Sequence, residues 1–296
     1  MRVVTLLPAA TEIVAALGGA GSLVGISHEC DYPASVLGLP RVTATPIDPA
    51  APGAAIDAEV RRLQAAGRPV IGVDAEGIRR LAPDLIITQD LCEVCAVAQG
   101  EVHRLAAVMS APPAVLALSG RTLEGVWADI HAVADALDLA PDGDELVSGL
   151  RSRLGRLGAR RHGPRPRVVC VEWLDPLYLA GHWVPEMVYA AGGEAVGATA
   201  GSHSSRRQWN ELPGLRPDLL VIMLCGFGIE RTLAELGAFE TPPAPGTLGT
   251  LPVWVLDGNS YTSRSGPRVV DGTELLQGAF EGREARGMVR WRGHGA

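Results

Sequence analysis

The sequence of 296 residues lacks the marks of several large protein classes. No run reaches the roughly 18 to 20 uninterrupted apolar residues that a membrane-spanning helix needs, so no membrane insertion is expected. Lys and Arg together number 26 against 33 Asp and Glu, for a formal charge of -7, which argues against nucleic acid as the main partner. The 5 cysteines are an odd number and do not suggest a disulfide framework, so a reducing, cytoplasmic location is predicted.

Motifs of the common nucleotide-binding and hydrolytic enzymes are also missing. No Gly-rich phosphate loop and no Ser nucleophile elbow follows a predicted strand, and no catalytic triad can be assigned from residue order. The segment from Arg2 to Leu17 has the charged and apolar regions of an export signal, but Pro8 and Glu12 interrupt it. The segment is therefore not predicted to be an export signal, and neither a phosphate-loop nor a triad-based activity is predicted.

What the sequence does contain is an internal repeat, which divides it into two similar halves. Each half begins with a short β-branched run, continues into a helical pattern that ends at Gly-Gly, and later shows Pro-Asp before another buried-strand run. This order is typical of βαβ units around a parallel sheet, so we predict an α/β fold with two Rossmann-like lobes. The matching segments are residues 2–7 and 167–172, 12–19 and 186–193, and 83–87 and 217–221.

A helical connector is predicted between the two lobes. Leu123 to Leu139 has the pattern of an amphipathic helix, and after a break at Pro141 to Asp144 a second helical pattern runs to about Arg161. Such a stiff link predicts little hinge bending. The predicted organisation is an N-terminal lobe at 1–120, a connector at 121–163, a C-terminal lobe at 164–282 and a disordered tail at 283–296.

Candidate site residues follow from the predicted sheets, because ligands of open parallel sheets bind at the loops after the carboxyl ends of the strands. In such loops aromatic faces can line a flat ligand, arginines can bind carboxylate or phosphate groups, and histidines can bind a metal or a polar group. The predicted ligand-binding residues are His28, Glu29, Asp31, Tyr32, Asp90, Glu172, Trp173, His182, Trp183, Tyr261, Arg264 and Arg268.

The sequence leaves a plain structural interpretation open for each of these residues. His28 and His182 could act as axial ligands to cobalt or iron, or could simply bond to loop carbonyls. The tryptophans could pack between the lobes, the arginines could clamp loops, and several of the acidic residues could cap helices. The number of acidic residues in these loops favours a metal ion or a cationic ligand over an anionic one.

A thiolate cluster is the second predicted site. Cys92 and Cys95 form a Cys-x-x-Cys pair, whose two sulfurs can reach one point from a single turn. Cys30, Cys225 and either His28 or His182 are predicted to face the same cleft, which would give a site for zinc, iron or copper. A redox or nucleophilic thiol and buried thiols that only pack remain the alternatives.

Several motifs carry a resemblance to a known family, and it covers about residues 1 to 280. The chain resembles the helical-backbone substrate-binding proteins of vitamin B12 and iron-siderophore importers, and it is most similar to a leaderless branch labelled cobalamin-binding protein. The segments that resemble the family are 6–12, 25–33 and 80–87, and those similar to the branch are 27–33, 90–97 and 181–186.

The resemblance implies a rigid two-lobed fold, a long connecting helix and a cleft that takes a large, flat metal chelate. The expected ligand is therefore cobalamin or another corrinoid held between the lobes, and no importer partner is expected for a leaderless chain. The alternative is a metal-binding protein or metalloenzyme that uses the Cys/His cluster in the same cleft.

Overall fold

The computed structural model describes residues 1–90, 97, 99–158, 163–239 and 251–293. Their contacts divide the chain into two units. The first consists of residues 1–51, 55–120 and 124–149, and the second of 52–54, 121–123 and 150–296. Within the described ranges no helix combines the length and the apolar character needed to span a bilayer.

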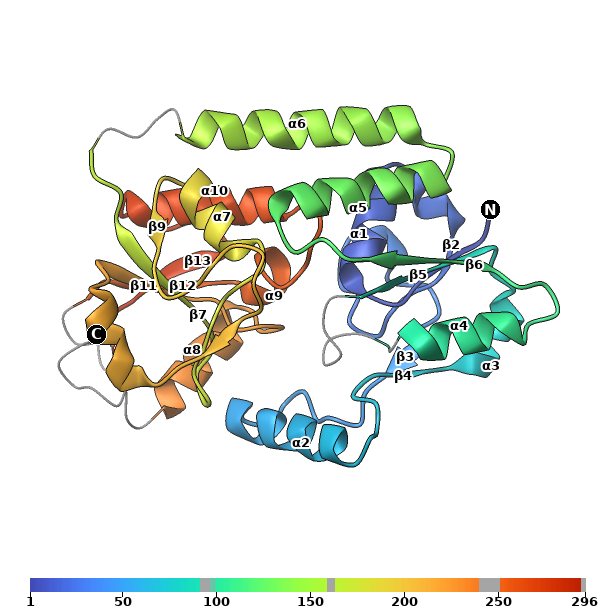
Figure 1. Cartoon of the computed structure of the whole chain (residues 1–296), viewed down its shortest axis with the longest axis horizontal. Helices are drawn as coiled ribbons and strands as arrows, with labels where there is room; N and C mark the ends of the chain where they lie inside the picture. The colour runs from blue at the N-terminus through green and yellow to red at the C-terminus, as the bar shows by residue number, and fades with distance from the viewer. Residues whose placement is uncertain (91–96, 98, 159–162, 240–250, 294–296) are drawn as a thin grey trace. The chain divides into compact units, whose positions relative to one another are not determined.

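The first unit is built on a parallel sheet with strand order β2-β1-β5-β6. Val3 and Val4 of β1 lie opposite Leu85 and Ile86 of β5, and all four side chains are buried. Helices α1 and α5 cover one face of the sheet and α3 and α4 the other (Figure 1). The strands are β1 (Val3–Thr5), β2 (Leu23–Gly25), β5 (Leu85–Gln89) and β6 (Ala114–Leu118), and the helices are α1 (Pro8–Ala16), α3 (Ala75–Leu81), α4 (Gln99–Ala107) and α5 (Leu123–Ala136).

Smaller elements complete this half of the chain. Strands β3 and β4 pair antiparallel beside the main sheet, and Thr43 lies opposite Val73. Helix α2 follows a Pro- and Ala-rich stretch, and it was not predicted from the sequence. The bounds are β3 (Thr43–Ala44), β4 (Gly72–Val73) and α2 (Gly53–Ala65), with short 3-10 helices at Gly19–Ser22 and Ala34–Val36.

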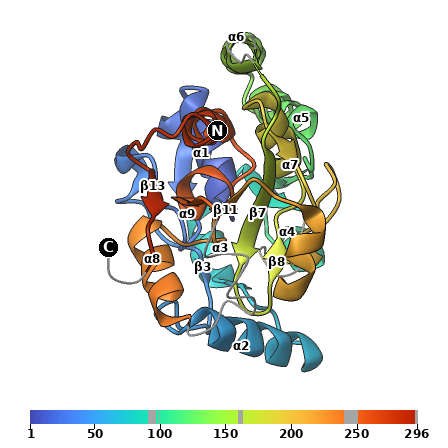
Figure 2. The same cartoon turned by 90° about the vertical axis from the view of Figure 1, so that its left-hand side faces the viewer.

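The second unit has a larger, mixed sheet with the order β10-β8-β7-β11-β12-β13, and β9 also pairs with β7. Strands β9, β7, β11 and β12 are parallel, whereas β8, β10 and β13 run antiparallel to their neighbours. Helices α7 and α10 lie on one side of the sheet and α8 on the other (Figures 1 and 2). The strands are β7 (Arg167–Trp173), β8 (Tyr178–Leu179), β9 (Glu194–Ala195), β10 (Ser205–Arg206), β11 (Leu219–Ile222), β12 (Val253–Leu256) and β13 (Met288–Trp291).

Helices α7 to α10 of the second unit are short, and α10 is the longest of them. Cys170 lies in the middle of β7, where burial raises the pKa of its thiol to about 12, so it is a core residue. The helices are α7 (Val184–Ala190), α8 (Ile229–Ala238), α9 (Gly258–Tyr261) and α10 (Val269–Phe280), with a 3-10 helix at Trp209–Leu215.

The sequence repeat corresponds to a repeated hydrogen-bond arrangement. In the first half, the backbone N–H of Arg2 donates to Asp84 Oδ2 at 2.6 Å, and the N–H of Asp84 donates to the carbonyl of Arg2 at 2.8 Å. In the second half, Arg167 and Asp218 make the same pair of bonds at 2.7 and 2.8 Å. Each exchange fastens the first strand of a lobe to the Pro-Asp turn that starts the neighbouring strand.

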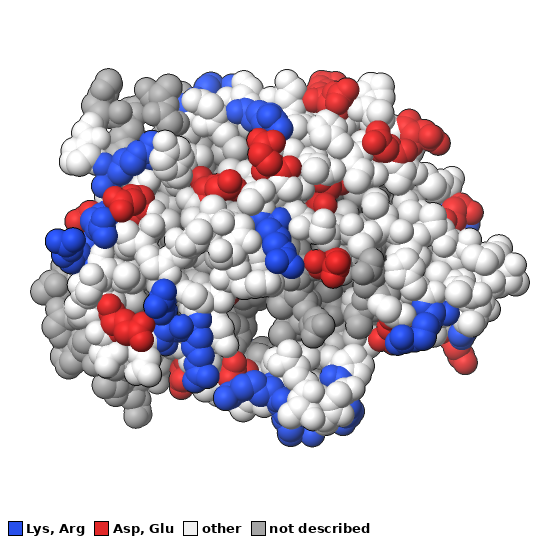
Figure 3. All heavy atoms as spheres, in the orientation of Figure 1, with Lys and Arg blue, Asp and Glu red and all other residues white. Residues whose placement is uncertain are grey.

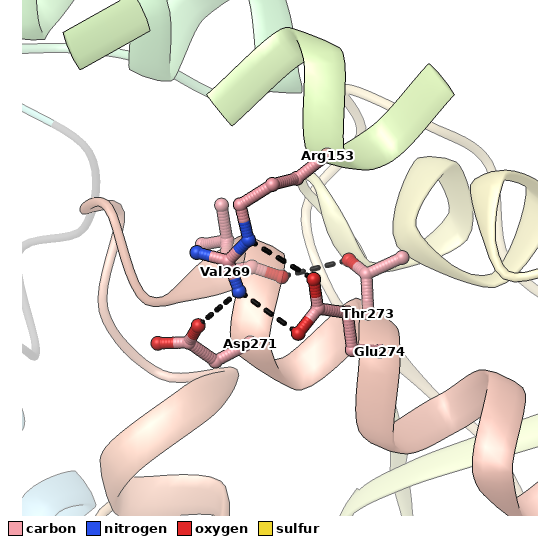
Figure 4. A network of polar contacts seen from close by, with 5 residues as sticks. All are labelled: Arg153, Val269, Asp271, Thr273 and Glu274. Carbon is pink, nitrogen blue, oxygen red and sulfur yellow. Dashed lines mark hydrogen bonds and ion pairs between the residues drawn. The ribbon is translucent and has the colours of Figure 1, made fainter. Parts of the chain in front are cut away.

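Two helices, α5 and α6 (Ala140–Gly158), occupy the predicted connector. The expected break at Pro141 is wrong: Pro141 lies in the first turn of α6, where no backbone N–H is needed. Arg153 of α6 donates to Asp271 and to both oxygens of Glu274, at 3.0 and 2.9 Å, on α10 (Figure 4). These bonds raise the pKa of Arg153 and hold the last turns of α6 against α10. Residues 159–162 of the predicted connector lie outside the described ranges.

The predicted tail needs a correction. Residues 283–296 were expected to be disordered, but Met288–Trp291 forms β13, which pairs antiparallel with all four residues of β12. The Arg-rich composition of this segment led to the wrong prediction, although the first residue of the strand, Met288, is fully buried.

On the face shown in Figure 3, acidic and basic side chains of the described residues are interspersed and do not gather into a patch of one sign.

Candidate functional site

In the first unit, the loop after β2 carries five of the predicted site residues. Cys30 is 2% exposed, and its sulfur lies 3.0 Å from the hydroxyl of Thr11, which shares a 2.6 Å hydrogen bond with Thr5. The loop therefore turns Cys30 into the protein, toward the start of α1. Glu29, Asp31 and Tyr32 point outward and are exposed.

His28 is held by a cluster of hydroxyl groups. Its backbone N–H donates to Thr43 Oγ1 at 2.9 Å, and its Nδ1 lies 2.7 Å from the same oxygen. Thr43 donates its single hydroxyl proton to Ser27 Oγ at 3.1 Å. The proton between Thr43 and Nδ1 must then come from the imidazole, which leaves the lone pair on Nε2. No described residue forms a hydrogen bond with that nitrogen.

Arg41 fixes the shape of this loop. Its Nη1 donates to the carbonyl of Ser27 at 2.9 Å and also to the carbonyl of Cys30. Partial burial lowers the pKa of His28, Glu29 raises it, and Arg41 lowers it, with a net decrease. At neutral pH His28 is therefore an uncharged imidazole with an available nitrogen.

The predicted thiolate cluster receives no support from the part of the first unit that is described. Cys92 and Cys95 lie outside the described residues, so the Cys-x-x-Cys pair is not placed. Asp90 is exposed and continues the β5–β6 pairing through its N–H to the carbonyl of Leu118. Across the described ranges, no group of three or more His, Cys, Asp and Glu side chains is arranged to hold a metal ion.

In the second unit, the carboxyl ends of β7 and β11 meet as the sequence predicts. The N–H of Cys225 donates to the carbonyl of Glu172 at 3.0 Å, and Trp173 packs against Phe227 with ring centroids 5.3 Å apart and the ring planes tilted by 52°. The indole N–H of Trp173 is buried and has no hydrogen-bond partner among the described residues. A half-buried aromatic pair with one unsatisfied donor therefore lies at the end of this sheet.

A charged pair on α8 extends this aromatic group. The guanidinium carbon of Arg231 lies 4.5 Å from the ring centre of Phe227, and Arg231 donates to Glu235 Oε1 at 3.2 Å. The other carboxylate oxygen of Glu235 accepts the N–H of Gly53 at 3.1 Å. Glu235 thereby binds the first residue of α2 and also orients the arginine over the aromatic pair.

The loop after β12 contains three predicted residues. Arg264 is only 6% exposed and donates to Asn259 Oδ1 at 2.8 Å, so it is a buried clamp within its own loop. Arg268 lies over the ring of Tyr261, with its guanidinium carbon 5.7 Å from the ring centre. The structure therefore brings Tyr261 and Arg268 together and favours the structural interpretation of Arg264.

His182 and Trp183 lie in the turn between β8 and α7. Trp183 is 7% exposed and donates its indole N–H to the carbonyl of Thr262 at 3.1 Å, which makes it a packing residue of this unit. His182 adopts φ of 51°, a left-handed conformation that costs free energy outside glycine. Its Nε2 is buried without a partner among the described residues, and its role toward a ligand stays a prediction.

Sequence reasoning missed the residues that position these side chains. Thr43 and Arg41 lie 15 and 14 residues from the groups they bind, and a single sequence gives no sign of such a pairing. Phe227 was in the predicted loop after β11, but nothing in the sequence set it apart from its neighbours. An aromatic residue two positions after Cys225 is the one signal that could have identified it.

Comparisons with known proteins identify the fold. No family model matches the chain, and no curated protein matches it either. A periplasmic heme-binding protein from Pseudomonas aeruginosa has a TM-score of 0.73 and 20% identity, with 100% of this chain and 99% of that chain covered.

Two further solved structures agree. The periplasmic heme-binding protein BhuT, in complex with two hemes, has a TM-score of 0.67 and 23% identity over 93% of this chain and 96% of its own. The periplasmic vitamin B12-binding protein BtuF of Vibrio cholerae has a TM-score of 0.61 and 20% identity over 95% of this chain and 96% of its own. The chain therefore has the helical-backbone fold of periplasmic binding proteins, as the sequence predicted.

Proposed function

We propose that this chain is a binding protein for a flat metal chelate, cobalamin or a related corrinoid in the first instance and heme in the second. The observation that carries the proposal is the extent of the structural match: proteins described as binding heme or vitamin B12 align with 93 to 100% of the chain. The match includes both units of the chain.

His28 supports the proposal in the first unit. Its tautomer is fixed by Thr43, its pKa is lowered, and the nitrogen left over is a neutral imidazole donor. Cobalt and iron in macrocycles accept such a donor as an axial ligand. A bare metal ion would need further ligands nearby, and the described residues do not provide them.

The aromatic pair supports the proposal in the second unit. Trp173 and Phe227 lie at the strand ends, and Trp173 keeps an unsatisfied buried N–H that a polar edge of a ligand could accept. Burying an unpaired donor costs about 1–3 kcal/mol, which ligand binding would recover. Tyr261 with Arg268 offers a second aromatic and cationic surface.

Titration of the ligand-free protein with cobalamin, and separately with hemin, tests the proposal through visible absorption spectra. We expect saturable binding at roughly micromolar concentration or tighter for one of the two. His28→Gln should change the bands that report axial ligation, while His131→Gln, an exposed histidine on α5, should leave them unchanged. Failure of both chelates to bind would refute the proposal, and binding with unchanged bands in His28→Gln would refute the role of His28.

We also propose a cytoplasmic location without an importer partner. The odd number of cysteines supports this, and Cys170 and Cys225 are free thiols. Cell fractionation of the native host with an antibody to the chain is the test. Recovery in the periplasmic or extracellular fraction would overturn the location and reopen the question of a transporter.

A further inference from the structure

The first turn of α2 is grouped with the second unit, although the rest of the helix is grouped with the first. Residues Pro52–Ala54 belong to the second unit and residues 55–65 to the first. Gly53 donates its N–H to Glu235 Oε2 at 3.1 Å. A Cβ added to Gly53 would lie 3.2 Å from that oxygen and 3.5 Å from Trp173 Cζ2. The segment Pro52–Ala54, which we call the strap, therefore packs directly on the ring of Trp173.

The strap lies against the edge of Trp173 that carries its hydrogen-bond donor. The Cβ position of Gly53 is 3.7 Å from Trp173 Cε2, and that carbon is bonded to Nε1. The Nε1 atom is buried and has no partner among the described residues. The strap therefore has to move before an acceptor on a ligand can approach the indole N–H from this side.

The two ends of α2 are held unequally. Among its 13 residues only Gly53 and Leu63 are buried. Leu63 is fully buried in the hydrophobic cluster of the first unit that also contains Val4 and Ile86. Taking a leucine out of such a cluster costs more free energy than the loss of one hydrogen bond. Motion of α2 therefore begins at the Gly53 end, which has no side chain to bury.

The docked position of the strap is close to energetic balance. Docking forms one hydrogen bond, from Gly53 to the carboxylate of Glu235, and it covers the unpaired indole N–H of Trp173. The gain from the first and the penalty of the second are of similar size. Glu235 keeps a partner when the strap leaves, because Arg231 donates to its other oxygen at 3.2 Å and lies over Phe227. Undocking therefore uncovers Trp173 without removing the other contacts of the aromatic pair.

We propose that the strap acts as a lid on the indole edge of Trp173, with Glu235 as the residue that holds it closed. The inference rests on the proposed function only for what passes the lid, a flat chelate that carries a hydrogen-bond acceptor at its edge. An acceptor that binds the indole N–H interacts with the open position alone, so it shifts the equilibrium toward opening. The lid is then part of ligand entry in the second unit.

Exchange of the Trp173 indole proton with solvent tests the lid on the full chain without any ligand. Nuclear magnetic resonance with isotope-labelled tryptophan follows this proton, and its signal is identified by its absence in Trp173→Phe. Glu235→Ala removes the acceptor that holds the strap, so the indole proton should exchange roughly tenfold faster. The indole proton of Trp183, which is bonded to Thr262, should exchange at its wild-type rate. Unchanged exchange at Trp173, or an equal increase at Trp183, would overturn the proposal.

A second variant separates the strap from the arginine that Glu235 also binds. Gly53→Pro removes the N–H that Glu235 accepts, leaves the bond from Arg231 in place, and suits the first position of a helix. It should accelerate exchange at Trp173 as Glu235→Ala does, whereas Glu230→Ala, at an exposed position on the same helix, should not. An acceleration in Glu235→Ala that Gly53→Pro fails to reproduce would assign the effect to Arg231 and overturn the lid.

The association rates of cobalamin and hemin give a readout of ligand entry. For the chelate that binds, rapid mixing should show a faster association in Gly53→Pro, by about the factor found for indole exchange, because the open position is more populated. An association rate equal to that of the wild type would overturn the role of the strap in entry. Failure of both chelates to bind refutes the proposed function, and the exchange experiment still decides whether the strap opens.

Discussion

The two halves of the chain share one frame and differ in how the first strand leads into the first helix. In the first half only residues 6–7 separate β1 from α1, whereas residues 174–183, including β8, separate β7 from α7. The Arg–Asp exchange, the strand register and the Gly-Gly helix end are nevertheless the same in both. The repeat therefore fixes the frame, and His182 and Trp183 lie in the segment where the halves diverge.

Equivalent residues can also take different roles. Glu12 and Glu186 occupy matching positions of the repeat, but Glu12 is 3% exposed in the first unit while Glu186 accepts the N–H of Leu123. The same residue type at the same position of the frame is thus buried in the interior in one half and accepts a backbone hydrogen bond in the other. Sequence similarity between the halves predicts architecture better than it predicts function.

The largest test of this equivalence is the removal of matching core side chains. Ile13 of α1 and Met187 of α7 are both fully buried. Ile13→Ala and Met187→Ala should each lower the free energy of unfolding by about 2–5 kcal/mol, because each leaves a cavity in a packed interior. Urea unfolding measures the loss, with Val108→Ala, at an exposed position, as the control. A lower free energy of unfolding in only one of the two variants would show that the matching position in the other half is not tightly packed.

The next effect concerns the glycines that end the two helices. Gly18 has φ of 79° and Gly192 has φ of 92°, a region that disfavours other residues by about 1–2 kcal/mol. Gly18→Ala should cost about this much, because nothing lies near its Cβ position. Gly192→Ala should cost at least as much, because that residue is also buried. Equal stability of either variant and the wild type in urea would contradict the repeated helix end.

The Arg–Asp exchange should give a smaller and equal effect in the two halves. Asp84→Ala and Asp218→Ala each remove the acceptor of one backbone N–H at an exposed site, for an expected loss of about 1 kcal/mol. The same urea experiment applies, and the exposed Asp48, which accepts a local N–H from Ala50, offers a matched control in Asp48→Ala. Losses that differ between the halves by more than the error would mean that the two exchanges are not equivalent.

The smallest effect is the pH dependence that His28 contributes in the first half. The pKa of His28 is lower in the folded protein than its ordinary value, so the unfolded chain takes up the proton first as the pH falls. Stability should therefore decrease as the pH drops below about 6.5, and less steeply in His28→Gln. Unfolding free energies at several pH values measure the slope. An identical slope in the variant would show that His28 is not desolvated as described.

Much of the frame was predictable from the sequence, because β-branched runs, the Gly-Gly helix ends and the Pro-Asp turns are local signals. The parallel core strands were predicted within a few residues, and the fold class is confirmed. The two-residue strands β3, β8, β9 and β10 and the strand β13 were missed, since short strands lack an alternating apolar pattern.

The candidate site was less predictable because its geometry is not local. The sequence placed His28, Trp173 and Tyr261 at strand ends, but their partners Thr43, Phe227 and Arg268 follow from how the chain folds. Trp183 and Arg264, which the sequence analysis places among the ligand contacts, are largely buried, and their role toward a ligand stays a prediction. The assignment of every residue to a ligand stays a prediction until binding is measured.

The C-terminal strand has a consequence for the behaviour of the protein at high concentration. Val253–Leu256, the buried Val-Trp-Val-Leu run of β12, has the composition of segments that form intermolecular β-structure, and β13 occupies its outer edge. The N–H of Arg290 in β13 is in turn bonded to Glu284, so that donor is not offered to another molecule. Removal of the last strand would therefore expose the edge of β12 to pairing with another molecule.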